Sequence, residues 1–474
     1  MTTDESTSTV SAPPTPPLRA RGAWLVLLIA CGASFTELLD ASIVNVALFT
    51  IRNDLGLSDL GLQWVVNAYL LAFGGLLLLG GRAADMFGIR RMLVVGLVVF
   101  IVASLLGGLA LNGAWLVAAR AGQGVGAAII APTTLAILTT YFTDPKQRAG
   151  AIGAWITAGV VGAALGSLIG GLLTDLLDWR WVLWINVPVG LLLLGGALVG
   201  LREIRRPAQR PGFDLAGAAA VTAGLLLVVL GAASTSSYGW GSPRTLVPLL
   251  GGVALLVAFV AIERRVRTPI VPLDIFRLRT VSAGNAVAFL ANAASLPMYY
   301  LLGLFLQDVY GFSPLQAGLA FLPLSFSIVM GSFAGSMLLP KVGPRPPMLA
   351  GAAIAAAGQV WLSLAPDDGS YPVHVLVPTI LMGIGIGAIF VPATSTATAG
   401  VAEERSGLAS GLVNTANQFG GALGVAVLAT FAASFATAAA GYTNAMLLAA
   451  GVVLLAGVAA FSAPRALPEG AGTP

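Results

Sequence analysis

Long apolar runs recur along almost the whole chain, and they constrain its fold more than any other feature. A helix rises about 1.5 Å per residue and the hydrocarbon core of a bilayer is about 30 Å thick, so about twenty apolar residues can cross it. Fourteen such runs are present, at 24–49, 63–81, 92–110, 114–140, 149–174, 182–201, 214–233, 245–262, 281–307, 314–338, 347–364, 373–399, 407–434 and 441–462. Since only 9% of the residues are charged, a bilayer is the solvent that fits this chain. We therefore expect an all-α polytopic membrane protein with 14 transmembrane helices.

The distribution of Lys and Arg gives an independent test of this number of spans. If both termini are cytoplasmic, all but four of the 24 basic residues fall in cytoplasmic segments; the exceptions are Arg52, Arg180 and Arg244 in outer loops and Arg120 within a span. Basic residues gather on the cytoplasmic side of membrane proteins, and losing one span would scramble the alternation. The pattern predicts an even number of spans, cytoplasmic termini and a multi-pass protein of the inner (plasma) membrane, and the abundance of Ala and Gly favours a bacterial source.

Composition also predicts how the chain is divided. The first residues carry Ser, Thr and Pro without an apolar core, which is typical of a disordered tail and not of a signal peptide. The basic segments 202–213 and 263–280 contain prolines and are expected to be hinges. The predicted division is a cytoplasmic tail at 1–22, a six-helix bundle at 23–201, linkers with an inserted helix pair at 202–280, a second six-helix bundle at 281–463 and a tail at 464–474.

Ionisable residues inside the spans are the strongest pointers to function. An ionised side chain there costs about 2.5 to 3.5 kcal/mol even on lenient insertion scales, and three clear cases exist, namely Glu37, Asp40 and Arg120. Glu37 and Asp40 are three residues apart, so they share a helical face and are expected to look into one cavity. Two close carboxylates in a low dielectric do not both ionise easily, which favours proton binding. The alternatives are a neutralised pair held by Arg120 for packing, or a Glu37 near the outer water boundary that has no role.

Arg120 opens a polar and glycine-rich stretch in the fourth span. Gln123 and Gly124 follow one turn later, and Gly122 and Gly126 form a pair of small residues that permits tight helix packing. A guanidinium that is always charged can respond to protonation of a carboxylate or can serve as a static counter-ion. Both interpretations remain open at this stage.

The cytoplasmic segment from Gly81 to Arg91 combines glycines with charges of both signs. Its glycines allow a tight crossing between helices, and Asp85 can accept charge-assisted hydrogen bonds from Arg90, from Arg91 or from a neighbouring helix end. A salt bridge there would lock one conformation. The alternative is an ordinary basic inner loop.

The fifth span carries four glycines at close spacing, at Gly162, Gly166, Gly170 and Gly171. Small residues at four-residue spacing form a smooth ridge that favours close helix contact. Spacing alone leaves open whether that contact is static or slides.

Together these features resemble the major facilitator superfamily, and specifically its fourteen-span drug:proton antiporter family, over nearly the whole chain after the tail. The stretch from Leu39 to Leu48 is similar to the family's first-span signature, with Asp40 and Asn45 at its polar positions. The inner-loop motif is matched by Gly81, Asp85, Gly88, Arg90 and Arg91, the fourth-span motif by Arg120, Gln123, Gly124 and Gly126, and the antiport motif of the fifth span by Gly162, Gly166, Gly170 and Gly171. Further family-like strings begin at Trp179, Gly311 and Gly407.

Three positions depart from the family pattern. Ser167 stands where the antiport motif usually has proline, Ile89 interrupts the basic run of the loop motif, and Phe49 replaces the usual proline of the first-span signature. The related loop of the second half, from Lys341 to Arg345, lacks an aspartate. The resemblance therefore supports transport more strongly than antiport.

The resemblance implies two six-helix bundles that rock around a midplane cavity, exporting small amphipathic or cationic organic molecules, such as drugs and antibiotics, in exchange for protons. It implies that Asp40 is the leading proton carrier, with Glu37 a second candidate, that Arg120 is the coupling partner, and that the loop with Asp85 is a conformational gate. A uniporter or an importer of a small metabolite on the same scaffold is the alternative. The expected partners are the small-molecule substrate, protons and the lipid bilayer, with no nucleic acid, and a monomer is expected to function.

The sequence gives few signs of where a substrate binds. Polar and aromatic residues that could line a cavity are Asn45, Gln123, Tyr299, Tyr300, Gln307, Asn414 and Gln418; interhelical packing or lipid contact is the alternative for each. Cys31 and His374 are the only residues of their types and do not suggest metal or redox chemistry, so no cofactor is expected. A membrane-embedded enzyme would need a cluster of nucleophile, base or metal ligands, and none is visible in the sequence.

Overall fold

The computed structural model describes residues 20–142, 144–201, 214–266, 269–366, 369–402 and 405–466, and within them almost every residue is helical. The first half comprises α1 (Ala20–Leu55), α2 (Asp59–Phe87), α3 (Ile89–Gly108), α4 (Gly113–Tyr141), α5 (Pro145–Leu176), α6 (Trp181–Trp184) and α7 (Asn186–Gly200). Two helices follow, α8 (Leu215–Tyr238) and α9 (Pro243–Glu263). The second half comprises η1 (Leu273–Arg277), α10 (Arg279–Asp308), α11 (Pro314–Val342), α12 (Arg345–Ser363), η2 (Pro372–Leu376), α13 (Val377–Thr398), α14 (Ser406–Ala433) and α15 (Ala438–Ala460).

Within this described part, thirteen helical segments are long and apolar enough to cross a membrane. The remaining predicted span is α12, which has 19 residues, enough for about 28 Å of helix, and which packs along α13 and α15. Its arginine, two prolines and glutamine lower its mean hydropathy, and one face of it, with Met348, Ala352, Ala355 and Leu362, is buried against its neighbours. Each predicted apolar run therefore coincides with a helix, and the all-α polytopic fold is confirmed.

The sixth span is broken at Ile185 into α6 and α7. Pro188 lies one turn after Trp184 and has no backbone N–H, so it cannot continue the hydrogen-bond ladder across this point. As a result, Asn186 becomes the first residue of α7, and its side chain is buried inside the first half. The sequence-based span at 182–201 contains no hint of this break beyond the proline itself.

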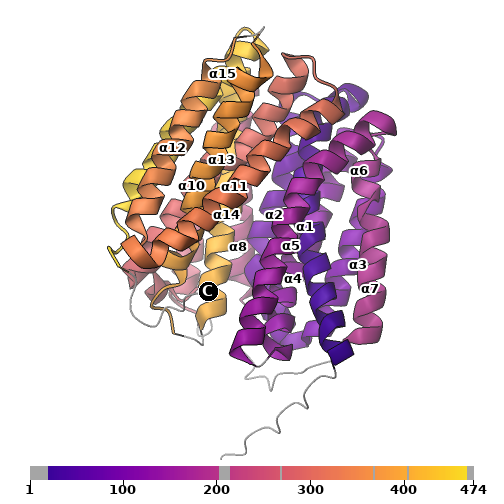
Figure 1. Ribbon diagram of the computed structural model, residues 1–474, viewed down its shortest axis with the longest axis vertical. Helices are drawn as coiled ribbons and strands as arrows, with labels where there is room; N and C mark the ends of the chain where they lie inside the picture. The colour runs from indigo at the N-terminus through magenta and orange to yellow at the C-terminus, as the bar shows by residue number, and fades with distance from the viewer. Residues whose placement is uncertain are drawn as a thin grey trace, which may run out of the picture.

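Figure 1 shows the helices of the first half, in indigo to magenta, beside those of the second half, in orange to yellow. The two halves meet mainly through α5 with α11, α2 with α14, and α1 with α10. The helices α8 and α9 pack on one another, and α8 also contacts α2 and α14. The predicted hinge segment 202–213 and the tails at 1–19 and 467–474 lie outside the described residues.

Glycines let the paired helices approach closely. A methyl group at Gly170 would lie 2.5 Å from the Ile43 carbonyl oxygen, and one at Gly162 would overlap the Phe35 carbonyl, so both glycines face α1. Gly171 faces the other way, because a methyl group there would lie 2.5 Å from the Pro314 carbonyl oxygen of α11. The glycine ridge of the fifth span thus serves two contacts, one within the first half and one between the halves.

Candidate functional site

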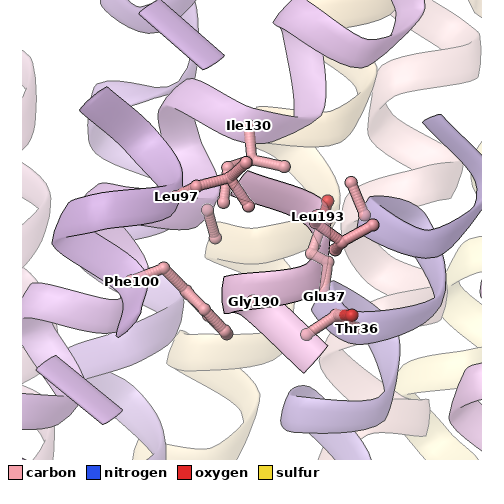
Figure 2. Close-up of a pocket in the computed structure, with 9 residues that line it drawn as sticks. Thr36, Glu37, Leu97, Phe100, Ile130, Gly190 and Leu193 are labelled. Atoms are coloured by element: carbon pink, nitrogen blue, oxygen red, sulfur yellow. The ribbon is translucent and has the colours of Figure 1, made fainter. Parts of the chain in front are cut away.

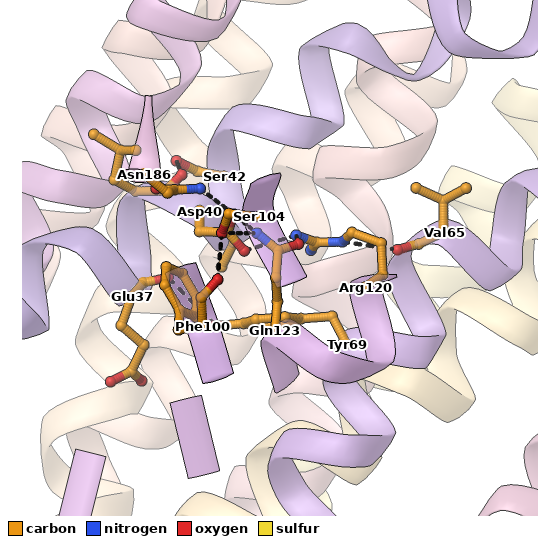
Figure 3. A network of polar contacts seen from close by, with 12 residues as sticks. Glu37, Asp40, Ser42, Val65, Tyr69, Phe100, Ser104, Arg120, Gln123 and Asn186 are labelled. Atoms are coloured by element: carbon orange, nitrogen blue, oxygen red, sulfur yellow. Dashed lines mark hydrogen bonds and ion pairs between the residues drawn. The ribbon is translucent and has the colours of Figure 1, made fainter. Parts of the chain in front are cut away.

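Asp40, on α1, lies at the centre of a buried polar network in the first half (Figure 3). Its side chain is completely buried, and three side chains from other helices donate hydrogen bonds to it. Arg120 Nη1 lies 2.7 Å from Asp40 Oδ2, while Gln123 Nε2 and Asn186 Nδ2 lie 2.9 and 2.7 Å from Oδ1. Asp40 is therefore surrounded by donors that stabilise its ionised form.

Arg120, on α4, is only 2% exposed and makes contacts on several sides. Besides Asp40, its guanidinium donates to the Val65 carbonyl at 3.1 Å and to Gln123 Oε1 at 2.8 Å, and it lies over the Tyr69 ring at 4.5 Å. Removing one partner from a buried ion pair is strongly destabilising, because it leaves an uncompensated charge. The pair therefore ties α1 and α4 together, with α2 as a third support.

The hydrogen bonds of Gln123 determine which way its amide group points beside the ion pair. Its Oε1 faces Arg120, so its Nε2 points to both Asp40 and Ser104 Oγ, each at 2.9 Å. Ser104 in turn donates to the Phe100 carbonyl at 2.7 Å. The predicted juxtaposition of Arg120, Gln123 and a first-span carboxylate is therefore present in the structure, and α3 supports it.

Glu37 does not share this network, so the expectation that both carboxylates look into one cavity is wrong. Its side chain extends away from Asp40 in Figure 3 and lines an apolar pocket that also contains Leu97, Phe100 and Leu193 (Figure 2). Side chains of a helix tilt toward its N-terminus, so the longer Glu37, one turn before Asp40, reaches further from it. The shared helical face was predicted correctly, but the reach of the side chain was not considered.

The residues of the predicted gate lie at the junction of α2 and α3. Gly88 has φ of +98°, a backbone conformation that side-chain-bearing residues rarely adopt, and it turns the chain from one helix into the next. Arg90 donates to the carbonyls of Ala197 and Leu198 at 3.3 and 2.7 Å, at the C-terminal end of α7. Asp85 and Arg91 are exposed, and Gly81 is half-buried. Arg90 thus stabilises the C-terminal end of α7, a contact that the sequence does not predict.

Most of the residues proposed to line a cavity instead make contacts within their own helix or with a neighbouring helix. Gln307 donates to the Val46 and Gly303 carbonyls at 3.0 and 3.1 Å, and Asn45 donates to the Ala41 carbonyl at 2.9 Å. Tyr300 is buried, and Tyr299 stacks on Phe321 with ring centroids 5.6 Å apart. In contrast, Asn414 is exposed and Gln418 is half-buried, so these two amides on α14 remain candidates for substrate contact.

A second polar cluster joins the two halves at the end where α1 finishes, which the basic-residue pattern predicts to be the outer end. Arg52, expected in a loop, lies in the last turn of α1, and its Nη2 is 2.5 Å from Asp308 Oδ1 of α10. The Tyr442 hydroxyl of α15 donates to Asp308 Oδ2, also at 2.5 Å. We call Arg52, Asp308 and Tyr442 the outer latch.

Sequence reasoning missed the latch and also Asn186, Ser104 and Tyr69. Asn186 lies within the family-like string that begins at Trp179. Its one available signal was an amide inside an apolar run, two residues before a proline. Nothing in the sequence marks Tyr69 as the cation–π partner of Arg120, because an aromatic residue in a span is usually a packing residue.

The sequence and the fold were compared with known proteins. The family model of the Major Facilitator Superfamily matches residues 30–425. The cephamycin export protein CmcT of Amycolatopsis lactamdurans is 45% identical over 413 residues, covering 86% of this chain and 85% of that protein. The puromycin resistance protein pur8 of Streptomyces alboniger is 42% identical over 457 residues, covering 92% and 90%.

Solved structures with low sequence identity share the fold. A bacterial homologue of the human lysosomal transporter Spinster, in an inward-facing and unoccupied conformation, matches with a TM-score of 0.69 and 19% identity, covering 94% of this chain and 97% of the other. A D-xylose–proton symporter matches with a TM-score of 0.68 and 14% identity, covering 94% and 98%. With the helical architecture, the family match and the two relatives in agreement, the chain is a multi-pass membrane transporter that belongs to the Major Facilitator Superfamily.

Proposed function

We propose that this transporter exports small amphipathic organic molecules of the antibiotic type in exchange for protons, by alternating access, from the cytoplasm of a bacterial cell. The observation that carries the proton coupling is the Asp40–Arg120 ion pair, at 2.7 Å and with both side chains at most 2% exposed. Export of antibiotic-like molecules is supported by relatives named for cephamycin export and puromycin resistance. We further propose that both termini are cytoplasmic and that a monomer suffices.

The ion pair gives protonation a structural consequence. A proton on Asp40 removes its negative charge, and Arg120 then keeps only its bonds to the Val65 carbonyl and Gln123 together with the Tyr69 ring. The attraction that ties α1 to α4 is lost while the guanidinium stays charged. Proton binding thereby changes how two helices of the first half are held, which is what coupling to a conformational cycle requires.

Substrate and proton are expected to bind at different places. In the described part of the chain the three donors around Asp40 are protein groups, and Glu37 faces an apolar pocket between helices of the first half. Neither carboxylate is therefore placed to bind a cationic substrate directly. A substrate that uses apolar contact and neutral hydrogen bonds, such as those offered by Asn414 and Gln418, fits this arrangement better than one that requires a buried counter-charge.

The test is transport in liposomes with puromycin as the probe. Purified protein is reconstituted, a proton gradient of either sign is imposed, and puromycin movement and lumenal pH are followed together. We expect gradient-driven accumulation of puromycin with opposite proton movement in the wild type, its loss in Asp40→Asn, and its retention in Asp274→Asn, a control carboxylate that is exposed outside the spans.

Each contrary outcome assigns a different function. Puromycin movement without proton flux would make the protein a uniporter. Accumulation in the same direction as the protons would indicate an importer. Gradient-driven exchange that survives in Asp40→Asn would remove Asp40 as the proton carrier and make Glu37 the leading candidate.

A further inference from the structure

Asn186, one of the three hydrogen-bond partners of Asp40, has a buried polar atom without a hydrogen-bond partner in the described part of the chain. Its side chain is 1% exposed, and its Nδ2 donates to Asp40 Oδ1 at 2.7 Å. Its own Oδ1 is buried and accepts no hydrogen bond from any group in the described part of the chain. A buried amide oxygen without a donor costs free energy, so this arrangement needs an explanation.

We propose that Asn186 is a positioning residue that serves both protonation states of Asp40 by turning its amide over. In the ionised state its Nδ2 donates to the carboxylate, as the structure shows (Figure 3). In the protonated state the amide rotates by about half a turn about its terminal torsion, and Oδ1 accepts the new Asp40 O–H. The inference deepens the proposed function and rests on its assignment of the proton to Asp40.

Neither of the other two hydrogen-bond partners of Asp40 in the described residues can accept that proton without losing existing bonds. Arg120 has only donors. Gln123 Oε1 is already bonded to Arg120 Nη1, and turning Gln123 over would break this bond and its bond to Ser104. Asn186 loses only its bond to Asp40 when it turns, and it regains one immediately.

The charged and titratable groups near Asp40 do not accept its proton, so a neutral side chain takes this role. Glu37 on its own helix α1 extends away from it, Tyr69 of α2 lies against Arg120, and Arg120 of α4 is the single cation of the network. The helices α3 and α7 contribute the neutral Ser104 and Asn186. On α5, the neutral Gly166 lies against Ser42 and the Leu39 carbonyl.

Both protonation states of Asp40 depend on Asn186, but not equally. Without Asn186 the buried O–H of protonated Asp40 would have no acceptor, which costs free energy. Hydrogen bonds to an ionised group are roughly twice as strong as neutral ones, so removing the amide destabilises the ionised state more than the protonated state. The surplus, ~1 kcal/mol, corresponds to a change of about fivefold in the proton concentration needed for half-protonation.

Infrared difference spectroscopy of the purified full-length protein tests the inference without a substrate. The C=O band of the protonated Asp40 carboxyl group is identified by its loss in Asp40→Asn. In Asn186→Leu, which has a similar volume but no amide, we expect this band to move to higher wavenumber, because the O–H has lost its acceptor. We also expect half-formation of the band at about fivefold lower proton concentration, and Asn186→Gln should restore both values toward those of the wild type.

Gln359→Leu is the matched control. Gln359, on α12 of the second half, is an equally buried amide whose Oε1 also has no described donor, but it has no carboxylate partner. We expect its replacement to leave the Asp40 band unchanged. If Asn186→Leu fails to fold, Asn186→Ala tests the same loss without added bulk.

The outcomes separate the inference from the proposed function. A wild-type Asp40 band that keeps its position in Asn186→Leu and Asn186→Ala would overturn the role of Asn186 and leave the proton on Asp40. A difference spectrum in which Asp40→Asn removes no carboxyl band would refute the proton site itself, and the role of Asn186 with it. A band shift of the same size in Gln359→Leu would also overturn the inference, since the effect would not be specific to the neighbour of Asp40.

Discussion

The outer latch should set the balance between two conformations of the transporter. Arg52 and Asp308 belong to different halves, their side chains are 22% and 13% exposed, and their nearest N–O distance is 2.5 Å. Asp308 also accepts the Tyr442 hydroxyl, and Arg52 lies 5.3 Å from the Phe49 ring centroid. If the outer end opens during transport, α1 and α10 must separate and these bonds must break.

Arg52→Gln removes the charge and keeps a donor of similar length. A hydrogen bond between two charged groups contributes about 1.5 to 3 kcal/mol when it is well shielded, and less when water reaches it, so we take ~1 to 2 kcal/mol for this partly exposed pair. Because the pair exists only while this end is closed, its loss should shift the equilibrium toward opening by about 5- to 30-fold.

Distances between spin labels measured by double electron–electron resonance report this equilibrium. Asn53 and Ser370 are exposed, and they lie at the outer end on the first and second halves. Both are changed to cysteine in a Cys31→Ala background, since Cys31 is the only native cysteine. In Arg52→Gln we expect a larger fraction of long distances.

Arg405→Gln is the control for this experiment, because Arg405 pairs with Asp274 at 2.8 Å but the two side chains are 48% and 55% exposed and neither belongs to the first half. Exposed pairs of this kind contribute little, so the distance distribution should not change. An Arg52→Gln distribution that coincides with that of the wild type, under conditions in which both conformations are populated, would refute the latch.

Three further predictions concern packing and the cytoplasmic end. Gly162→Val should lower the thermal stability and the yield of folded protein, because this glycine lies against the α1 backbone and overpacking costs about 1 to 3 kcal/mol. Gly153 has open space around it, so Gly153→Val should behave like the wild type in the same melting assay. Arg90→Gln should lower the melting temperature in detergent by a few degrees, since it removes donors from two carbonyls at the end of α7, and an unchanged melting curve would contradict that capping role. The hydrogen bond from Arg405 lowers the pKa of Asp274, so this pair contributes fully above the ordinary aspartate pKa of about 3.9 and loses its contribution as pH falls through the lowered value. The difference in melting temperature between wild type and Arg405→Gln should accordingly stay constant from pH 8 to about 5 and vanish in stronger acid; a difference that varies between pH 8 and 6 would exclude this origin.

The residues of the site that could be predicted from the sequence are those whose charge costs free energy inside the bilayer. Asp40 and Arg120 stand out because an ionised side chain in a span needs a compensating partner, and the structure pairs them across 80 positions of sequence. Asn186 could not be predicted on this basis, because a neutral amide costs much less and is not rare in membrane helices. Its importance depends on the break before α7, which places it beside α1.

Predictions failed where the side chain's reach or an exact helix end decided the outcome. The helical period placed Glu37 and Asp40 on one face correctly, but only coordinates show that the longer side chain enters a different pocket. Arg52 was assigned to a loop because apolar runs do not show that α1 continues to Leu55. Gln307 was proposed for a cavity, yet it donates to the Val46 carbonyl, because a buried polar group on a span satisfies itself on a neighbouring backbone as readily as on a ligand.

These placements suggest how a proton bound in one half could affect the other. Within the described residues the Asp40 side chain forms hydrogen bonds to side chains of the first half, so direct electrostatic contact with a substrate in the second half does not couple the two. The same helix, α1, carries Val46, whose carbonyl binds Gln307, and Arg52, which binds Asp308. Residues 40, 46 and 52 follow one another at six-residue intervals, about 9 Å apart along the axis. If protonation of Asp40 releases α1 from α4, the helix that moves is the one that holds the outer end closed, so coupling requires no contact between proton and substrate.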